Sequence, residues 1–325
     1  MSGTISYSST VYKILHVPSS FDATFSLVTS PIFSPLVLAI IRLTLAVYGT
    51  VFVIVTLVHQ SFTDHSGKHY FSFFTELSYI GLVSYFWAAA VQTLFFARSR
   101  AVYPLQNWPR PLQFLHVLLH SSIVTYPILV TAVFWGVIAS PDTLSTPWSA
   151  WTNISEHALN TVFAAFEIFC TNASPSFGAN PHALSMPWIH LPFLIVMLAG
   201  YLGVAYITHA TQGFYTYSFL DPDREHAKLA AYIVGIGIAA VIAFVIVRYV
   251  CMGRAWIVFR FGSPILASEL NEDYSVHQGD LESSAGPRKS SQWSRIQKDE
   301  RQEKRKEDLE DWEEVSIPVT VVPGG

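Results

Sequence analysis

Six long apolar stretches dominate the pattern of hydrophobic and polar positions along the chain. Each has roughly the 20 residues that a helix needs to cross the hydrocarbon core of a bilayer. Short polar connections separate them, for example "TDHSGKH" at 63–69 and "FLDPDREH" at 219–226. The pattern therefore predicts six membrane-spanning helices. Their approximate positions are residues 35–58, 72–97, 112–138, 149–170, 188–211 and 229–253.

The connections between the predicted spans are short, so consecutive helices should pack antiparallel in an all-α bundle. An even number of spans puts both termini on one side of the membrane, and the side richer in Lys and Arg is expected to be cytosolic. The terminal side carries Lys13, Arg98, Arg100, Arg110, Arg254 and Arg260, and the opposite loops carry Lys68, Arg224 and Lys228. We therefore expect both termini in the cytosol.

Changes in composition divide the chain into three parts. Residues 1–34 form an N-terminal cytosolic segment, residues 35–255 the six-span membrane domain, and residues 256–325 a charged cytosolic tail. Ser, Gln, Lys, Glu and Asp dominate the tail, which is typical of a disordered segment. The N-terminus lacks a basic region followed by an apolar run, so no cleavable signal peptide is expected.

The overall composition agrees with an integral membrane protein and narrows the classes of partner. Hydrophobic residues make up 51% of the 325 residues, charged residues only 13%, and the formal net charge is −4. Nucleic acid is not an expected partner, because proteins that bind it normally carry a basic surface. Cys170 and Cys251 lie in predicted spans and form neither a disulfide framework nor a zinc pattern. The endoplasmic reticulum and the plasma membrane both remain open as locations.

Polar side chains inside the predicted spans are the first candidates for a functional site. A charged side chain at the centre of a bilayer costs about 2.5–3.5 kcal/mol on insertion scales, so each one needs a reason. A rise of about 1.5 Å per residue sorts these side chains by depth. The cytosolic half holds Arg42, His116, His120, Glu167 and Arg248, and the outer half holds Thr75, Glu76, His157 and His209.

The cytosolic group has a structural explanation. Arg42, Glu167 and Arg248 are predicted to pair across the bundle and neutralise one another. His116 and His120 are four residues apart and share a helix face, as two ligands of a metal or haem would. Such a site needs two or more further ligands, so interior histidines without a metal are the favoured interpretation.

The outer group suggests covalent chemistry. The His157 imidazole could remove the proton of the Thr75 hydroxyl as the threonine oxygen attacks a carbonyl carbon. Asn153, one turn before His157, could orient the ring or donate to the developing oxyanion. Glu156 is expected to point away from the face that these residues share. Threonines also occur in spans because they bond back to the preceding turn, so a purely structural Thr75 stays open.

Four stretches together resemble the androgen-induced, FAR-seventeen-a-like family of multi-pass membrane proteins. They are "FSFFTELSYIGLVSYF" around Thr75, "TYPILVTAVFWGVI" in the third predicted span, "WTNISEHALNTVFAAFEI" around His157 and "YITHATQGFYTYSFLDP" after the fifth. The resemblance covers about residues 35–255, which hold all six predicted spans and none of the tail.

The resemblance implies an atypical hydrolase that cleaves fatty acid esters of hydroxy fatty acids with a membrane-embedded threonine and histidine. Thr75 in "FFTEL" matches the threonine, and His157 in "WTNISEH" matches the histidine, with Asn153 in the preceding Trp-x-Asn. His209 matches a family histidine less closely and is expected to be a pocket residue. Glu76 stands where an apolar or amide residue is more usual, which implies an altered substrate preference. This hypothesis has a membrane lipid ester as substrate and needs no cofactor.

Two other classes of function stay open. A transporter, channel or lipid-binding scaffold would also explain charges in both halves of the membrane, although no inverted repeat is evident. A histidine-ligated metal or haem protein would require His116 and His120 to meet further ligands.

Overall fold

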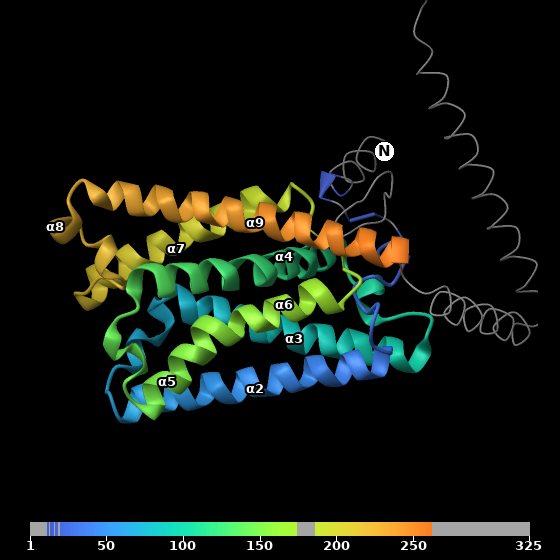
Figure 1. The fold of residues 1–325 in the computed structure, drawn as a ribbon, viewed down its shortest axis with the longest axis horizontal. Coiled ribbons are helices and arrows are strands. Elements are labelled where there is room, and N and C mark those ends of the chain that lie inside the picture. The colour runs from blue at the N-terminus through green and yellow to red at the C-terminus, as the bar shows by residue number, and fades with distance from the viewer. Residues whose placement is uncertain (1–11, 13, 16, 19, 174–185, 262–325) are drawn as a thin grey trace, which may run out of the picture. The chain divides into compact units, whose positions relative to one another are not determined.

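The computed structural model describes residues 12, 14, 15, 17, 18, 20–173 and 186–261, and its regular structure is helical with no strand in that part of the chain (Figure 1). The predicted disordered tail begins at residue 256, and all of it beyond residue 261 lies outside the described residues.

Five of the described helices are long and apolar enough to cross a membrane. They correspond to the first, second, third, fifth and sixth predicted spans, and their ends fall within about five residues of most of the predicted ones. Their bounds are α2 Pro35–Phe62, α3 Phe74–Ser99, α4 Arg110–Val133, α7 His190–Gln212 and α9 Lys228–Phe261. A π-helical turn, η3 Phe134–Ile138, extends α4.

The fourth predicted span is divided into three consecutive helical pieces. They are α5 Pro147–Ile154, the π-helical turn η5 Ser155–Leu159 and α6 Asn160–Cys170. None of these pieces is long enough alone to be one of the five candidate spans. In Figure 1 α5 lies beside the end of α2 and α6 beside α4, as the Phe52–Trp151 ring contact and the contacts between α4 and α6 also show.

Short helices occupy several connections. They are η1 Gly67–Ser72, η2 Pro104–Asn107, η4 Pro141–Leu144, η6 Ser218–Leu220 and α8 Pro222–Glu225. Local chemistry explains where the neighbouring long helices begin and end. The Ser34 side chain accepts a hydrogen bond from the Val37 N–H, and Pro35 occupies the first turn of α2. Gly213 ends α7 with φ of 79°, a conformation that glycine adopts without strain.

Helix α4 lies at the centre of the arrangement. It contacts α3, α6, α7 and α9, and Figure 1 shows it between α6 and the α7–α9 pair. In the most apolar part of α4, 72% of the residues are buried inside the protein, whereas the corresponding share is 22% for both α7 and α9. Helices α2 and α3 also pack closely, because a Cβ on Gly49 would lie only 2.5 Å from Val83 Cγ2.

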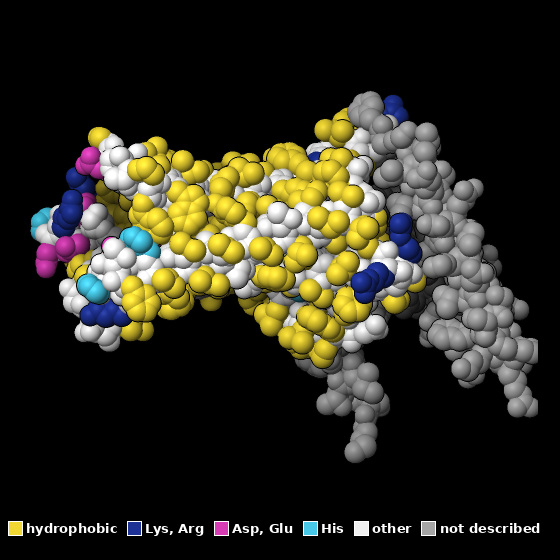
Figure 2. Space-filling model, turned by 90° about the horizontal axis from the view of Figure 1, so that it is seen from below, with side chains coloured by type: hydrophobic (Ala, Val, Ile, Leu, Met, Phe, Trp, Pro, Cys, Tyr) yellow, Lys and Arg dark blue, Asp and Glu magenta, His cyan; other side chains and the backbone are white. Residues whose placement is uncertain are grey.

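The outer surfaces of α2, α7 and α9 expose many large hydrophobic side chains. Val51, Ile207 and Ile246 are each more than half exposed. Figure 2 shows hydrophobic side chains across the middle of one face, with charged side chains gathered toward its two ends. A water-soluble monomer rarely exposes so large an apolar area, so this distribution and the five apolar helices suggest a membrane protein.

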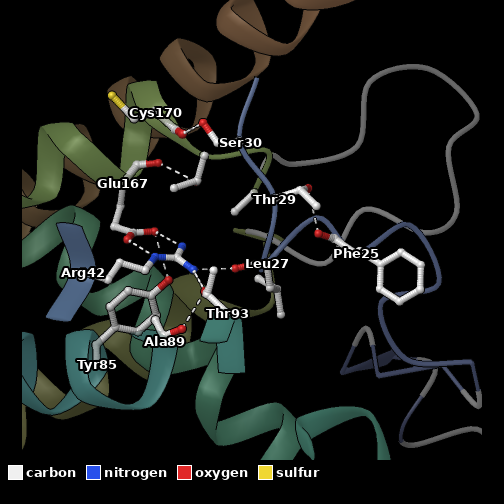
Figure 3. A network of polar contacts seen from close by, with 12 residues as sticks. Phe25, Leu27, Thr29, Ser30, Arg42, Tyr85, Ala89, Thr93, Glu167 and Cys170 are labelled. Carbon is white, nitrogen blue, oxygen red and sulfur yellow. Dashed lines mark hydrogen bonds and ion pairs between the residues drawn. The ribbon is translucent and has the colours of Figure 1, made fainter. Parts of the chain in front are cut away.

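A buried ion pair joins α2 to α6 (Figure 3). Arg42 Nε and Nη2 donate to the two carboxylate oxygens of Glu167 at 2.8 and 2.7 Å. Arg42 Nη1 donates to the Leu27 carbonyl at 2.9 Å and to Thr93 Oγ1 at 2.6 Å. The Tyr85 hydroxyl donates to Glu167 Oε2 at 3.1 Å. The predicted pairing of Arg42 with Glu167 is therefore confirmed.

Arg248 does not join this ion pair, so that part of the prediction is wrong. Its guanidinium donates to the Met186 carbonyl and lies 4.8 Å from the centre of the Trp188 ring. The long side chain of Arg248, in the C-terminal half of α9, reaches the backbone and the aromatic ring of residues just before α7. Sequence spacing gives the depth of Arg248 but not the direction in which it points.

Candidate functional site

An apolar cavity of about 240 Å³ lies among α4, α7 and α9 and the start of α3. Its walls consist mostly of Leu, Val, Ile and Phe side chains, and Thr75, Tyr201 and Tyr217 are the hydroxyl-bearing residues among those that line it. Helices α4, α7 and α9 also expose apolar side chains on the outside of the protein. The cavity therefore combines a space suited to a hydrocarbon chain with a small group of hydroxyls.

Thr75 lies in the first turn of α3, where the chain emerges from η1. This helix has no side-chain cap at its N-terminus, and its first N–H groups have no partner within the helix. The Phe74 N–H donates instead to the Tyr217 hydroxyl, with a nitrogen–oxygen distance of 3.1 Å. Thr75 is 9% exposed, and its side chain interacts with the same tyrosine hydroxyl.

The second tyrosine supports this end of the cavity. The Tyr201 hydroxyl lies 3.1 Å from the Ser72 carbonyl and 3.2 Å from Thr216 Oγ1, and both atoms can accept its hydrogen. Burial raises the pKa of the Tyr217 hydroxyl well above its ordinary value of 10.0. The Tyr217 side chain consequently stays protonated and can donate a hydrogen bond at any physiological pH.

His157 lies in the π-helical turn η5, beside the other π-helical turn, η3. Its ring stacks on Phe134 with ring centres 3.5 Å apart and planes 7° from parallel. Trp135 Nε1 donates to the His157 carbonyl at 2.8 Å. Phe134 lines the cavity but His157 does not. The structure therefore places Phe134, not His157, at the cavity wall.

Two glutamates accompany His157 and Thr75. His157 Nε2 lies 3.8 Å from Glu156 Oε2. The Glu156 carboxyl also interacts electrostatically with that of Glu76, the residue that follows Thr75. Glu156 was expected to point away from the face that Asn153, His157 and Asn160 share, yet its carboxylate lies beside the His157 ring. The wider i→i+5 turn of η5 changes the angular positions of its residues.

Several buried polar atoms in this region have no hydrogen-bond partner among the described residues. They are Glu76 Oε2, the Tyr79 hydroxyl oxygen and His157 Nδ1. The three side chains are 7%, 3% and 6% exposed. We call Glu76, Tyr79, Glu156 and His157 the outer cluster. Its first two members come from α3 and its last two from η5, and these two elements are in contact.

Asn153 and His209 lie apart from the cavity lining. The Asn153 amide donates to the carbonyls of Thr143 and Ser149 at 3.0 and 2.8 Å, so it holds the loop before α5 against that helix. His209 stacks on Tyr215 with ring centres 3.8 Å apart. Neither residue lines the cavity. Asn153 was predicted to support the reaction and His209 to line the pocket, and the structure places neither of them at the cavity that Thr75 lines.

The paired histidines of α4 are packed against an aromatic ring. His116 and His120 are both buried, and their ring centres lie 5.6 and 5.5 Å from that of Tyr85. Within the described part of the chain, no group of three or more His, Cys, Asp or Glu could hold a metal ion. Among the described residues, His116 and His120 therefore do not meet the further ligands that the metal hypothesis requires.

Sequence reasoning missed Tyr217, Tyr201 and Phe134 as parts of the site. The one available signal was the stretch "GFYTYSFL" at 213–220, where two tyrosines follow the glycine that ends α7. Aromatic residues are common at the ends of membrane helices, so this stretch alone does not indicate a site.

Comparison with known proteins found no matching family model, no matching curated protein and no matching solved structure. The fold and the site define an all-helical protein with five candidate membrane-spanning helices and an apolar cavity that bears a threonine hydroxyl.

Proposed function

We propose that this protein is a membrane-embedded hydrolase of lipid esters, such as fatty acid esters of hydroxy fatty acids. Thr75 is the nucleophile and His157 the base. The observation that carries the proposal is the position of Thr75 in the wall of a mostly apolar cavity, beside the hydroxyl-bearing Tyr201 and Tyr217. Such a cavity can bury an acyl chain and hold its ester group beside the hydroxyl.

The reaction proceeds through an acyl-enzyme. A bond forms between Thr75 Oγ1 and the ester carbonyl carbon while the threonine proton moves to His157. The bond to the alcohol oxygen then breaks, and His157 returns the proton to the leaving alcohol. Water releases the fatty acid by the same two steps, with His157 again accepting and returning the proton.

Bringing His157 to Thr75 requires a movement of Phe134. The Phe134 ring lines the cavity and covers one face of the imidazole. The contact between α3 and η5 and the electrostatic interaction of Glu76 with Glu156 support the pairing, since these glutamates are the neighbours of Thr75 and His157 in sequence. Catalytic contacts often shorten only when substrate is bound, and a bound acyl chain would displace Phe134.

The proposal includes six spans with both termini in the cytosol. The α5–η5–α6 segment would form the additional span, since Pro147–Cys170 contains 24 residues and is helical along its whole length. The substrate enters from the membrane between α4, α7 and α9, whose apolar side chains line the cavity.

A second candidate function is lipid binding without covalent chemistry. The observation that favours it is the position of His157 behind Phe134, outside the cavity lining. A lipid carrier or scaffold needs the cavity and the membrane-facing helices but no base. Stoichiometric binding of an intact lipid ester by the wild-type protein, without turnover, would support this candidate.

The test compares ester hydrolysis by membranes containing the wild-type protein, Thr75→Ala and His157→Ala. We expect both variants to lose at least about 10²-fold in turnover, because nucleophile and base act in the same step. Thr44→Ala is a matched control, since Thr44 is an exposed threonine on α2 whose hydroxyl donates to the Ile40 carbonyl, its one hydrogen bond to another described residue.

Labelling with a fluorophosphonate probe tests the nucleophile directly. The wild-type protein and the Thr44→Ala control should be labelled, and Thr75→Ala should not. Undiminished labelling of Thr75→Ala would show that another residue is the nucleophile.

A further inference from the structure

We propose that Tyr217 is a further catalytic residue, whose hydroxyl donates a hydrogen bond to the carbonyl oxygen of the ester as Thr75 attacks. The inference rests on the proposed hydrolase function and names the group that stabilises the negative charge of the reaction.

The position of Tyr217 is the first argument. Its side chain lines the same cavity as Thr75, and its hydroxyl oxygen lies 3.1 Å from the nitrogen of Phe74, the residue before the proposed nucleophile. A carbonyl carbon within reach of Thr75 Oγ1 would therefore hold its oxygen close to the Tyr217 hydroxyl.

The direction of hydrogen bonding is the second argument. The Phe74 N–H donates to the Tyr217 oxygen, so the tyrosine's own hydrogen is directed to another acceptor. The two side chains that interact with its hydroxyl, Thr75 and Tyr201, line the same cavity. Phe74 is the first residue of α3, and N–H groups at a helix N-terminus favour nearby negative charge. A chain that runs from this N–H through the tyrosine to the substrate strengthens each of its hydrogen bonds.

The surroundings of the ring are the third argument. The Tyr217 ring stacks on Phe219 with ring centres 5.1 Å apart and meets Phe73 edge-on at 5.8 Å. These contacts hold the hydroxyl in place before substrate binds, which is what an effective oxyanion donor requires. Tyr201 is less suitable, because Ser72 and Thr216 offer acceptors for its hydrogen.

The role of Tyr217 adds no proton transfer to the reaction. When Thr75 Oγ1 bonds to the carbonyl carbon, the π electron pair of the carbonyl moves onto its oxygen. Tyr217 donates to that oxyanion and keeps its own proton throughout. The oxyanion then reforms the carbonyl and expels the alcohol oxygen, which takes the proton held by His157.

The experiment measures kcat and KM for a fatty acid ester of a hydroxy fatty acid with the full-length protein in membranes. Tyr217→Phe should lower kcat by about 10²-fold or more, as the loss of one oxyanion donor does, with KM within about threefold of wild type. The same variant should react more slowly with the fluorophosphonate probe.

Two variants complete the design. Tyr215→Phe is the matched control in the same loop. The Tyr215 ring stacks on His209 outside the cavity lining, so loss of the Tyr215 hydroxyl should leave kcat unchanged. Tyr201→Phe removes a hydroxyl that donates elsewhere and should lower kcat less than Tyr217→Phe does.

The outcomes separate the two hypotheses. If Thr75→Ala is inactive while Tyr217→Phe keeps kcat within about threefold of wild type, or loses no more than Tyr201→Phe, only the Tyr217 inference is overturned. If the wild-type protein has no hydrolase activity, or Thr75→Ala retains it, the proposed function fails and the Tyr217 inference fails with it. Loss of activity in Thr75→Ala, together with a loss of kcat in Tyr217→Phe that exceeds the loss in Tyr201→Phe, supports both.

Discussion

Two buried polar regions of this protein differ in how completely their polar atoms are paired. We call Arg42, Tyr85, Thr93 and Glu167 the Arg42 network (Figure 3). Its arginine makes four hydrogen bonds, and both carboxylate oxygens of Glu167 accept. The outer cluster contains buried oxygen and nitrogen atoms that have no hydrogen-bond partner in the described part of the chain.

This difference in pairing indicates that the two regions have different roles. An unpaired buried polar group costs about 1–3 kcal/mol, so a protein that keeps several of them in one place is less stable than it could be. A fully paired network instead fixes how helices meet. We infer that the Arg42 network holds the bundle together and that the outer cluster is retained for its chemistry.

Glu167→Gln is expected to have the largest effect on stability. The change leaves the Arg42 guanidinium charged, buried and without its carboxylate, which typically costs about 3–5 kcal/mol. Thermal or denaturant unfolding of the purified protein in detergent measures the loss.

The double variant Arg42→Met/Glu167→Met is the control for that experiment. Replacing both charges with apolar side chains removes the unpaired charge, so it should be more stable than Glu167→Gln. If Glu167→Gln unfolded as the wild type does, the Arg42 network would not be structural.

Tyr85→Phe is expected to have the second largest effect. It removes the hydrogen bond from the Tyr85 hydroxyl to Glu167 Oε2, and a bond to a charged group contributes about 1.5–3 kcal/mol. Tyr79→Phe is a matched control on the same helix, because it removes a buried hydroxyl that has no partner among the described residues. Its stability should equal or exceed that of the wild type. Equal losses in the two variants would contradict the distinction between the regions.

Glu76→Gln should have the smallest effect on stability, within about 1 kcal/mol, because Glu76 Oε2 has no partner to lose. Its effect should be on turnover, since the carboxyl lies next to Thr75 and interacts with Glu156. Unfolding and ester hydrolysis are measured on the same preparation. A large loss of stability with unchanged turnover would assign the outer cluster a structural role.

The sequence predicted the helices well because their lengths and apolar composition are local properties. Five predicted spans coincide with α2, α3, α4, α7 and α9. The pairing of Arg42 with Glu167 also followed from depth, since opposite charges at the same level of a bundle attract one another. The fourth predicted span contains a π-helical turn, which apolar periodicity does not reveal.

The candidate site was predicted less completely. Depth counting placed Thr75 and His157 at the same end of the bundle, and the interaction between their sequence neighbours Glu76 and Glu156 is compatible with that. It did not predict that Phe134 covers the imidazole or that Asn153 bonds to Thr143 and Ser149. Both depend on the rotation of each helix about its axis, which neighbouring side chains decide.

The sequence by itself determined the class of the protein. Long apolar runs, few charges and short connections define an all-helical chain with helices suited to a membrane, because burial of apolar surface depends on composition and period. Only the tertiary structure decided which polar groups meet. Tyr217 and Phe74 are 143 residues apart in sequence and 3.1 Å apart in space, and contacts at such separations arise from packing.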